Sequence, residues 1–152
     1  MALCETLMLL LSLPLLLLLN HALADGLTLD IVSLGAKPDG KTDASPVLQT
    51  AWAKACDSTG PATIHVPIGT FYVQSGSFNG PCKNNAITIH IDGTLVASSD
   101  IQVLAKTKAW IGFKDVNGLS IHGGVIDGKG SGIWDCKHSG NDCPDGARVC
   151  II

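Results

Sequence analysis

The sequence predicts an all-β fold, most simply a parallel β-helix that carries one capping helix near its N-terminus. Short runs rich in β-branched residues recur along the chain and are separated by Gly, Asn and Asp. All 17 glycines lie after residue 24, and one amphipathic stretch precedes most of the short runs. Such strands suit stacked coils better than a roomy barrel, in which strands are longer. A β-sandwich also fits this periodicity.

Residues 1–24 are expected to be a signal peptide and not part of the fold. The run Leu7–Leu19 is almost wholly apolar, and the small-residue pattern Ala22-Leu23-Ala24 follows it. This pattern predicts cleavage between Ala24 and Asp25 and therefore secretion. Thirteen residues are too few to span a bilayer, which needs roughly 20. No membrane association is expected once the signal is removed.

Residues 25–152 are expected to form one domain with a modest net charge. The chain has 10 Lys and Arg and 13 Asp and Glu, and Glu5 is the one charged residue of the signal peptide. The mature balance is therefore 10 minus 12, or −2. This charge does not suggest a nucleic-acid partner. A polyanionic ligand would have to be bound by a few local lysines or by Arg148, which is the only arginine.

The first part of the mature chain is expected to hold an entry strand, a turn and the capping helix. Leu27–Leu34 alternates partly and ends at Gly35, and the Pro and Gly of residues 37–40 favour a chain reversal. A helix is predicted over residues 46–56, capped by Ser45 or Asp43. Its apolar stripe consists of Val47, Leu48, Ala51, Trp52 and Ala55. A helix in this position would cover the open end of a stack of strands.

Short strands are predicted through the rest of the chain, and residues 76–81 are expected to form a loop. The predicted strands are Thr63–Val66, Thr70–Val73, Ala86–Asp92, Thr94–Ala97, Trp110–Phe113, Leu119–His122 and Val125–Asp127. A faint internal repeat supports stacked coils, because Ile91-Asp92-Gly93 recurs as Ile126-Asp127-Gly128.

Five cysteines remain after the signal peptide and indicate an oxidising compartment. The expected disulfides are Cys56–Cys82 and Cys136–Cys143, and Cys150 is left unpaired. The first closes the longer loop and is expected to stabilise the fold by about 3 kcal/mol. Zinc is the other interpretation, but the spacing of Cys136 and Cys143 does not match the common ligand pattern. No metal site and no cofactor are predicted.

The histidines of the mature chain lack the short spacings of a metal site. His65, His90 and His122 alternate with apolar residues and are expected at surface or ladder positions on strands. Asp92 and Asp127 could pair as acid and base, but an Asp before Gly at a strand end is more typical of an Asx turn.

The tryptophans are expected to pack or to bind sugar. Trp52 is predicted to lie in the core, because it belongs to the apolar stripe of the helix. Trp110 and Trp134 fit either packing or stacking on sugar rings.

Several motifs occur in an order that resembles one known family. They are GAKPDGKTD (residues 35–43), AWAKAC (51–56), VPxGTF (66–71), FNGPCK (78–83), IDGTL (91–95) and GGxIDGxG (123–130). From about Val32 to Arg148 the chain resembles the N-terminal part of plant-type polygalacturonases, glycoside hydrolases that cleave pectin. The resemblance implies a right-handed parallel β-helix in the cell wall, with pectin (polygalacturonate) as substrate and hydrolysis of α-1,4 bonds between galacturonic acids.

The catalytic motifs of that family are absent from the sequence. The family uses Asn-Thr-Asp, Asp-Asp, Gly-His-Gly and Arg-Ile-Lys segments, and none of these strings occurs in the 152 residues. No catalytic residue is therefore expected in this chain, and no substrate-binding residue is assigned. The expectation is an inactive β-helix truncated after its first few coils, with a non-catalytic, pectin-binding wall protein as the alternative. We expect a monomer, or self-association through the edge of the last coil.

Overall fold

The computed structural model describes residues 26–100, 102–103, 109–140, 143 and 148–151. The expected signal peptide and its Ala24–Asp25 cleavage site lie outside the described residues. Within the described ranges, no helix is both long and apolar enough to cross a membrane.

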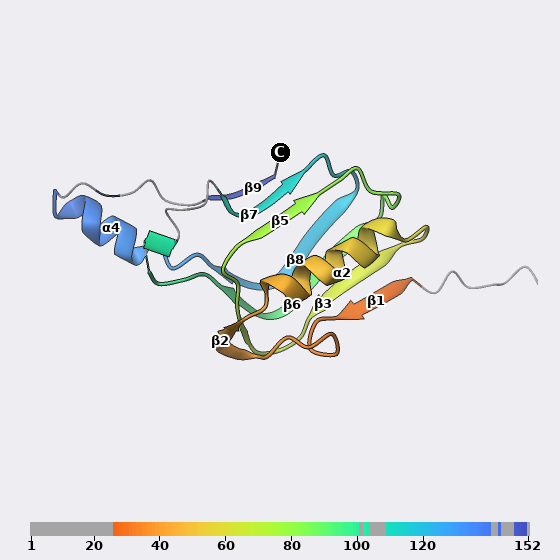
Figure 1. Cartoon of the computed structure of the whole chain (residues 1–152), viewed down its shortest axis with the longest axis horizontal. Coiled ribbons are helices and arrows are strands. Elements are labelled where there is room, and N and C mark those ends of the chain that lie inside the picture. Colours follow the sequence, from red (N-terminus) through yellow and green to blue (C-terminus); the bar gives the residue numbers. More distant parts are fainter. Residues whose placement is uncertain (1–25, 101, 104–108, 141–142, 144–147, 152) are drawn as a thin grey trace, which may run out of the picture.

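Strands dominate the described chain (Figure 1). In chain order the elements are β1 (Leu27–Asp30), β2 (Asp39–Asp43), α2 (Ser45–Asp57), β3 (Ala62–Val66), β4 (Thr70–Tyr72), β5 (Gly76–Asn79), β6 (Ile87–Val96), β7 (Ala109–Lys114), β8 (Leu119–Asp127), α4 (Ser131–His138) and β9 (Arg148–Ile151).

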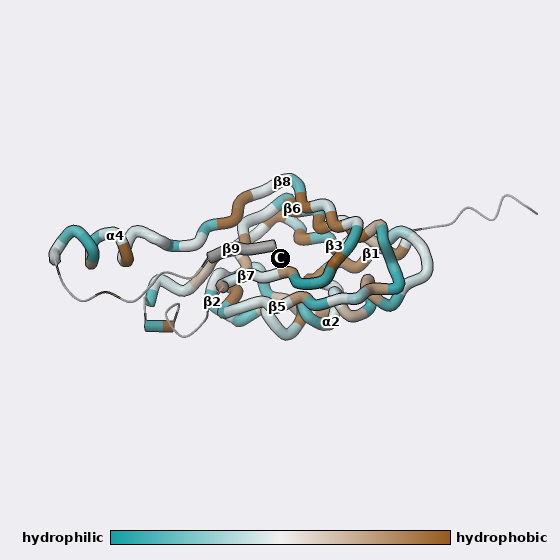
Figure 2. The backbone as a smooth tube through the Cα atoms, turned by 90° about the horizontal axis from the view of Figure 1, so that it is seen from above, coloured by the Kyte–Doolittle hydropathy of each residue, from teal (hydrophilic) through white to brown (hydrophobic). Residues whose placement is uncertain are grey.

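All the strand pairs of the structure are parallel and join one coil to the next. The first face consists of β1, β3 and the first halves of β6 and β8. The second consists of β2, β4 and the second halves of β6 and β8, and the third of β5, β7 and β9. Figure 2 shows β8 and β6 along one side of the molecule, with β5 and α2 along the other. The arrangement is a parallel β-helix, so the predicted fold class is confirmed.

The core fills the space between the three faces. Leu29, Ile64 and Ile89 occupy one register position on successive strands, and their side chains are buried. The residues between them point outward, as the two-residue period of a strand requires. Phe71 of the second face and Phe113 of the third are also buried, so all three faces contribute to one core.

Two strands of the structure, β6 and β8, continue through glycines at which the sequence predicted a break. Ala86–Asp92 and Thr94–Ala97 were expected to be separate, but β6 is continuous over Ile87–Val96 and its register shifts between Ile91 and Thr94. A Cβ at Gly93 would overlap the carbonyl oxygen of Pro67 in the adjacent coil. Gly93 therefore lets two coils approach at a corner. The same correction applies to β8, which continues through Gly123 and Gly124.

Other predicted boundaries also differ from the structure. Residues 76–81 were expected to be a loop but contain β5, in which Phe78 is buried and which pairs with β7. The entry strand ends at Asp30 and not near Leu34, because the Asp30 carboxylate accepts a hydrogen bond from the Ser33 N–H and starts a turn. The elements β2, α4 and β9 were not predicted.

The predicted helix is present as α2, although its N-cap differs from the prediction. Ala44 occupies the N-cap and makes no side-chain capping bond. Asp43 instead accepts hydrogen bonds from the backbone N–H and the hydroxyl of Ser45. The helix buries Leu48, Ala51, Trp52 and Ala55, and it contacts β1, β3 and β5. Its role as the N-terminal cap stays a prediction.

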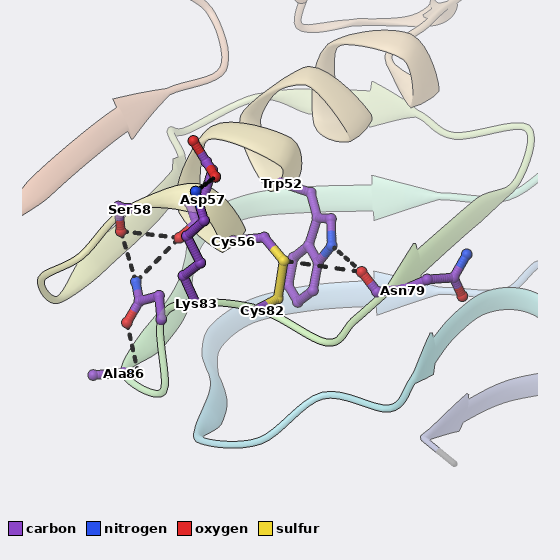
Figure 3. The surroundings of a disulfide bond; sticks show 10 residues. Trp52, Cys56, Asp57, Ser58, Asn79, Cys82, Lys83 and Ala86 are labelled. Carbon is purple, nitrogen blue, oxygen red and sulfur yellow. Dashed lines mark hydrogen bonds and ion pairs between the residues drawn. A yellow bond between two sulfur atoms is a disulfide. The ribbon is translucent and has the colours of Figure 1, made fainter.

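A disulfide links the C-terminal end of α2 to the segment that follows β5 (Figure 3). Cys56 is bonded to Cys82, and the Lys83 N–H donates a hydrogen bond to the Cys56 carbonyl oxygen at 2.9 Å. The buried amide of Asn84 donates to the Ala55 carbonyl oxygen at 3.1 Å and to the Ser58 hydroxyl at 2.9 Å. Covalent and polar contacts thus hold the same helix end.

Candidate functional site

A pocket of about 400 Å³ lies along the second face of the β-helix. Its walls come from successive coils: Lys41 from β2, Tyr72 from β4, Ser98 and Ser99 after β6, and Lys129 after β8. Because parallel strands end at the same edge of a sheet, these side chains gather although they are far apart in the sequence. The pocket joins two ammonium groups, one phenol and two hydroxyls.

The Asp39 carboxylate fixes the backbone around Lys41. It accepts hydrogen bonds from the Lys41 N–H at 2.9 Å and the Thr42 N–H at 2.8 Å, and from the Thr42 hydroxyl at 2.7 Å. The hydrogen bond from the Thr42 N–H is the largest cause that lowers the pKa of Asp39, to about 2. Asp39 is therefore ionised over the whole ordinary pH range and keeps this turn in place.

The other lysine of the pocket is paired with a carboxylate. The Lys129 ammonium lies 2.8 Å from Oδ2 of Asp127, and its backbone N–H donates to Oδ1 of the same residue at 2.9 Å. The hydrogen bond from the ammonium is the main cause of the lowered pKa of Asp127. The Asx turn predicted at Asp127 is therefore present. Lys41 has no ion-pair partner within the described ranges, so its charge is free for a ligand.

The pocket has the chemistry to bind an acidic sugar. Ammonium groups recognise carboxylates, while phenol and serine hydroxyls exchange hydrogen bonds with ring hydroxyls. A pocket whose lining spans four coils suits an extended ligand better than a compact one. No sequence pattern indicated this site, because Lys41 and Lys129 belong to separate motifs that the fold brings together.

The predicted ladder of histidines is confirmed by the strand register. His65 pairs with His90, and His90 with His122, on β3, β6 and β8. The rings of His90 and His122 lie with their centroids 4.8 Å apart. Asp92 departs from its expected Asx turn, because its carboxylate contacts the rings of His65 at 2.8 Å and His90 at 3.0 Å.

The three tryptophans differ in burial. Trp52 and Trp110 are buried, and the Trp110 N–H donates to the Val73 carbonyl oxygen at 2.8 Å, so both pack in the core. Trp134 on α4 is 61% exposed, with the Lys137 ammonium 5.5 Å from its ring centroid. In Figure 1, α4 extends away from the sheets. Trp134 is therefore the tryptophan that remains available to a sugar.

The cysteines and metal ligands give no second site in the part of the chain that the structure describes. Cys136 is bonded to Cys143, and no group of three or more His, Cys, Asp or Glu side chains could hold a metal ion there. Cys150 belongs to β9, but its side chain lies outside the described part, so its expected unpaired state stays a prediction.

Comparison with known proteins decides the family. The sequence profile of the glycosyl hydrolases family 28 matches residues 56–150. The chain belongs to this family. It is 51% identical over 140 residues to a polygalacturonase of Prunus persica, covering 91% of this chain and 36% of that protein. It is 42% identical over 119 residues to an exopolygalacturonase of Zea mays, covering 78% of this chain and 28% of that protein.

A third relative, and the lengths of all three relatives, show what share of their length this chain covers. A polygalacturonase of Gossypium barbadense is 38% identical over 102 residues, covering 66% of this chain and 25% of that protein. The chain thus spans about a third or less of the length of these relatives. The resemblance to polygalacturonases seen in the sequence motifs is confirmed, and the family 28 fold agrees with the observed β-helix.

Proposed function

We propose that this family 28 chain acts as part of a secreted, cell-wall polygalacturonase that hydrolyses α-1,4-galacturonosyl bonds in pectin. The 152 residues by themselves are proposed to bind the acidic polysaccharide without cleaving it. The family match over residues 56–150 supports the substrate class. The absence of the paired-carboxylate motifs from the whole sequence supports the lack of cleavage. This combination of membership and missing acids carries the proposal.

The electrostatics of the described carboxyl groups supports the same proposal. Inverting hydrolysis needs one carboxyl group that keeps its proton near neutral pH, so its pKa has to be raised. Every described acid with a shifted pKa has its pKa lowered. Hydrogen bonds are the largest cause for four of these acids. For Asp43 the largest single effect is burial, which raises the pKa, but its hydrogen bonds together outweigh burial. These acids are Asp30, Asp39, Asp43, Asp92 and Asp127. None of these groups is suited to be the general acid.

Cleavage is tested by measuring reducing ends released from polygalacturonate by the purified secreted chain. No release above the buffer blank is expected, even at a protein concentration that gives saturating binding. A polygalacturonase of full length serves as the positive control. Steady turnover by this chain would refute the claim that it lacks a complete set of catalytic groups.

Binding is tested by calorimetry with oligogalacturonides. The chain is expected to release heat on binding, and Lys41→Ala is expected to weaken the affinity by about 5- to 10-fold, as expected for a charge-assisted contact of about 1 kcal/mol. Lys54→Ala removes a charge on α2, outside the pocket, and serves as the matched control. Equal losses for both variants would show non-specific attraction, and no heat with the unchanged chain would contradict binding.

The alternative is a wall protein of the same family that binds pectin and never contributes to hydrolysis. Trp134 and the pocket favour this candidate, because both can contact a sugar without the missing acids. The two candidates separate by the secreted protein that an antibody against residues 25–152 detects. A longer polypeptide that releases reducing ends from polygalacturonate supports the first candidate, whereas a protein of this chain's size that binds pectin without cleaving it supports the alternative.

A further inference from the structure

A row of ionisable side chains crosses the outer face of the first sheet, away from the pocket. Asp30 on β1, His65 on β3, His90 on β6 and His122 on β8 occupy one register position. Nδ1 of His65 lies 3.1 Å from Oδ2 of Asp30, and Nε2 of the same ring lies 2.8 Å from Oδ2 of Asp92. One imidazole ring therefore joins carboxylates from the strands on either side of it.

Both ring nitrogens of His65 must donate hydrogen bonds for this arrangement to be satisfied. An ionised carboxylate has only acceptor oxygens, and a neutral imidazole has one donor and one acceptor nitrogen. In neutral His65, one nitrogen lone pair would face a carboxylate oxygen. Only the imidazolium form donates to Asp30 and Asp92 at once.

We infer that His65 is a pH-sensitive clamp that holds β1 to the coil stack more firmly in mildly acidic than in alkaline solution. The strand it holds is the outermost one of its sheet, in the order β1-β3-β6-β4-β2. The side chains of Leu29 and Ile31 are buried at this end of the core. Opening of β1 would expose these two side chains to water, so the clamp keeps the N-terminal end of the hydrophobic core covered.

The charges that face His65 come from two neighbouring strands. The strand β1 contributes Asp30, and β6 contributes Asp92 together with His90, whose ring centroid lies 5.8 Å from that of His65. Helix α2 packs on the opposite, apolar side of β3, so its charged residues do not face the ring. His122 stands one strand further away, and within the described ranges its ring makes no hydrogen bond to a carboxylate.

The pKa shifts agree with this geometry. The hydrogen bond to Asp92 is the main cause that raises the pKa of His65 above 6.5. The pKa of Asp92 is lowered chiefly by His65, and that of Asp30 chiefly by the Ser33 N–H. The raised pKa of His65 stabilises the fold below pH 6.5, and this contribution is lost as the pH rises through the pKa of the folded state. The lowered aspartate pKa values stabilise the fold above pH 3.8, so the clamp is strongest between pH 3.8 and pH 6.5.

The clamp is tested by urea unfolding of the oxidised secreted chain at about pH 5.5 and about pH 8.5. The midpoint of the unchanged chain is expected to fall at the higher pH. His65→Gln is expected to remove most of this fall in the unfolding midpoint, because a glutamine between Asp30 and Asp92 cannot become protonated. His122→Gln removes a histidine of the same row and is expected to keep the pH dependence. An unchanged pH dependence in His65→Gln would overturn the inference.

A second measurement needs no variant that might unfold. Two-dimensional NMR of the ring nitrogens of the unchanged chain is expected to show His65 protonated at both nitrogens near pH 6.5, with a titration midpoint above that value. A His65 ring that is half neutral or more at that pH would overturn the inference. This result is independent of pectin binding, so the clamp and the proposed function fail separately.

Discussion

The indole N–H of Trp52 donates a hydrogen bond to the backbone carbonyl oxygen of Asn79 across 3.2 Å (Figure 3). The same ring packs against Phe78 and Phe113, with centroid distances of 5.4 Å and 5.6 Å. A single side chain of α2 therefore contacts the second and third coils through β5 and β7. Residues 52, 78 and 113 form an aromatic cluster that joins the helix to the β-helix.

Replacing Trp52 is expected to cost more stability than any surface change. Trp52→Ala should lower the free energy of unfolding by about 3–5 kcal/mol, because it removes a large buried side chain and leaves a cavity. Urea unfolding followed by circular dichroism measures this loss. Trp134→Ala is the matched control, and its effect should stay within about 0.5 kcal/mol because the ring is exposed. Similar losses for the two variants would contradict the packing of α2.

Asn84 is expected to be essential for the connection at the C-terminal end of α2. Its buried side chain donates to Ala55 and Ser58 and accepts from the Ala86 N–H at 2.8 Å. Asn84→Ala should cost about 1–3 kcal/mol, because buried backbone groups lose their partners. The neighbouring Asn85 is exposed, so Asn85→Ala in the same denaturant titration should have little effect. A neutral Asn84→Ala variant would disprove the role of this amide.

Gly118 is expected to tolerate no side chain. It has a φ of +70°, and a Cβ there would overlap the carbonyl oxygen of Asn85. Gly118→Ala should therefore lower stability by about 2–3 kcal/mol or more, through strain and displacement of the adjacent coil. Gly60 has open space around it, and Gly60→Ala should be neutral or slightly stabilising. Thermal unfolding of the two variants checks this contrast, and equal melting temperatures would contradict it.

The two disulfides are expected to differ in their effect on folding. Replacing Cys56 and Cys82 together by Ser should cost about 3 kcal/mol, because that bond closes a separation of 26 residues and connects α2 to the coils. The bond between Cys136 and Cys143 closes only 7 residues beside the exposed helix α4, so the corresponding double variant should lose less. Unfolding midpoints of both double variants measure the difference. A larger loss at the C-terminal pair would show that α4 contributes more to the fold than its exposure indicates.

Local sequence patterns predicted an all-β chain of short strands with one helix, because each coil repeats the same simple chemistry. The family motifs were needed to favour the β-helix over a β-sandwich. Runs such as Thr63–Val66 alternate buried and half-buried residues, and α2 has a clear apolar stripe. The strand β5 escaped prediction because Gly76 and Ser77 have low strand propensity, and its pairing with β7 stabilises it. Whether a glycine breaks or bends a strand, as at Gly93, depends on the coil beneath it.

The candidate sites were less predictable because their residues meet only after the coils stack. The pocket joins Lys41 to Lys129, and the clamp joins Asp30 to Asp92 through His65. Neither pair has a characteristic spacing, since the number of residues per coil varies. For Asp92, the local Asp-Gly pattern indicated a turn, but two histidines on neighbouring strands are its actual partners.

The close approach of the coils at Gly93 has a consequence for how changes would propagate. A side chain at residue 93 would collide with the Pro67 carbonyl oxygen and would push the third coil away from the second at this corner. In a linear stack each layer rests on the one before it, so a small tilt at one layer is passed on to all later layers. A methyl group at residue 93 would thus change the orientation of every later coil of this family 28 β-helix.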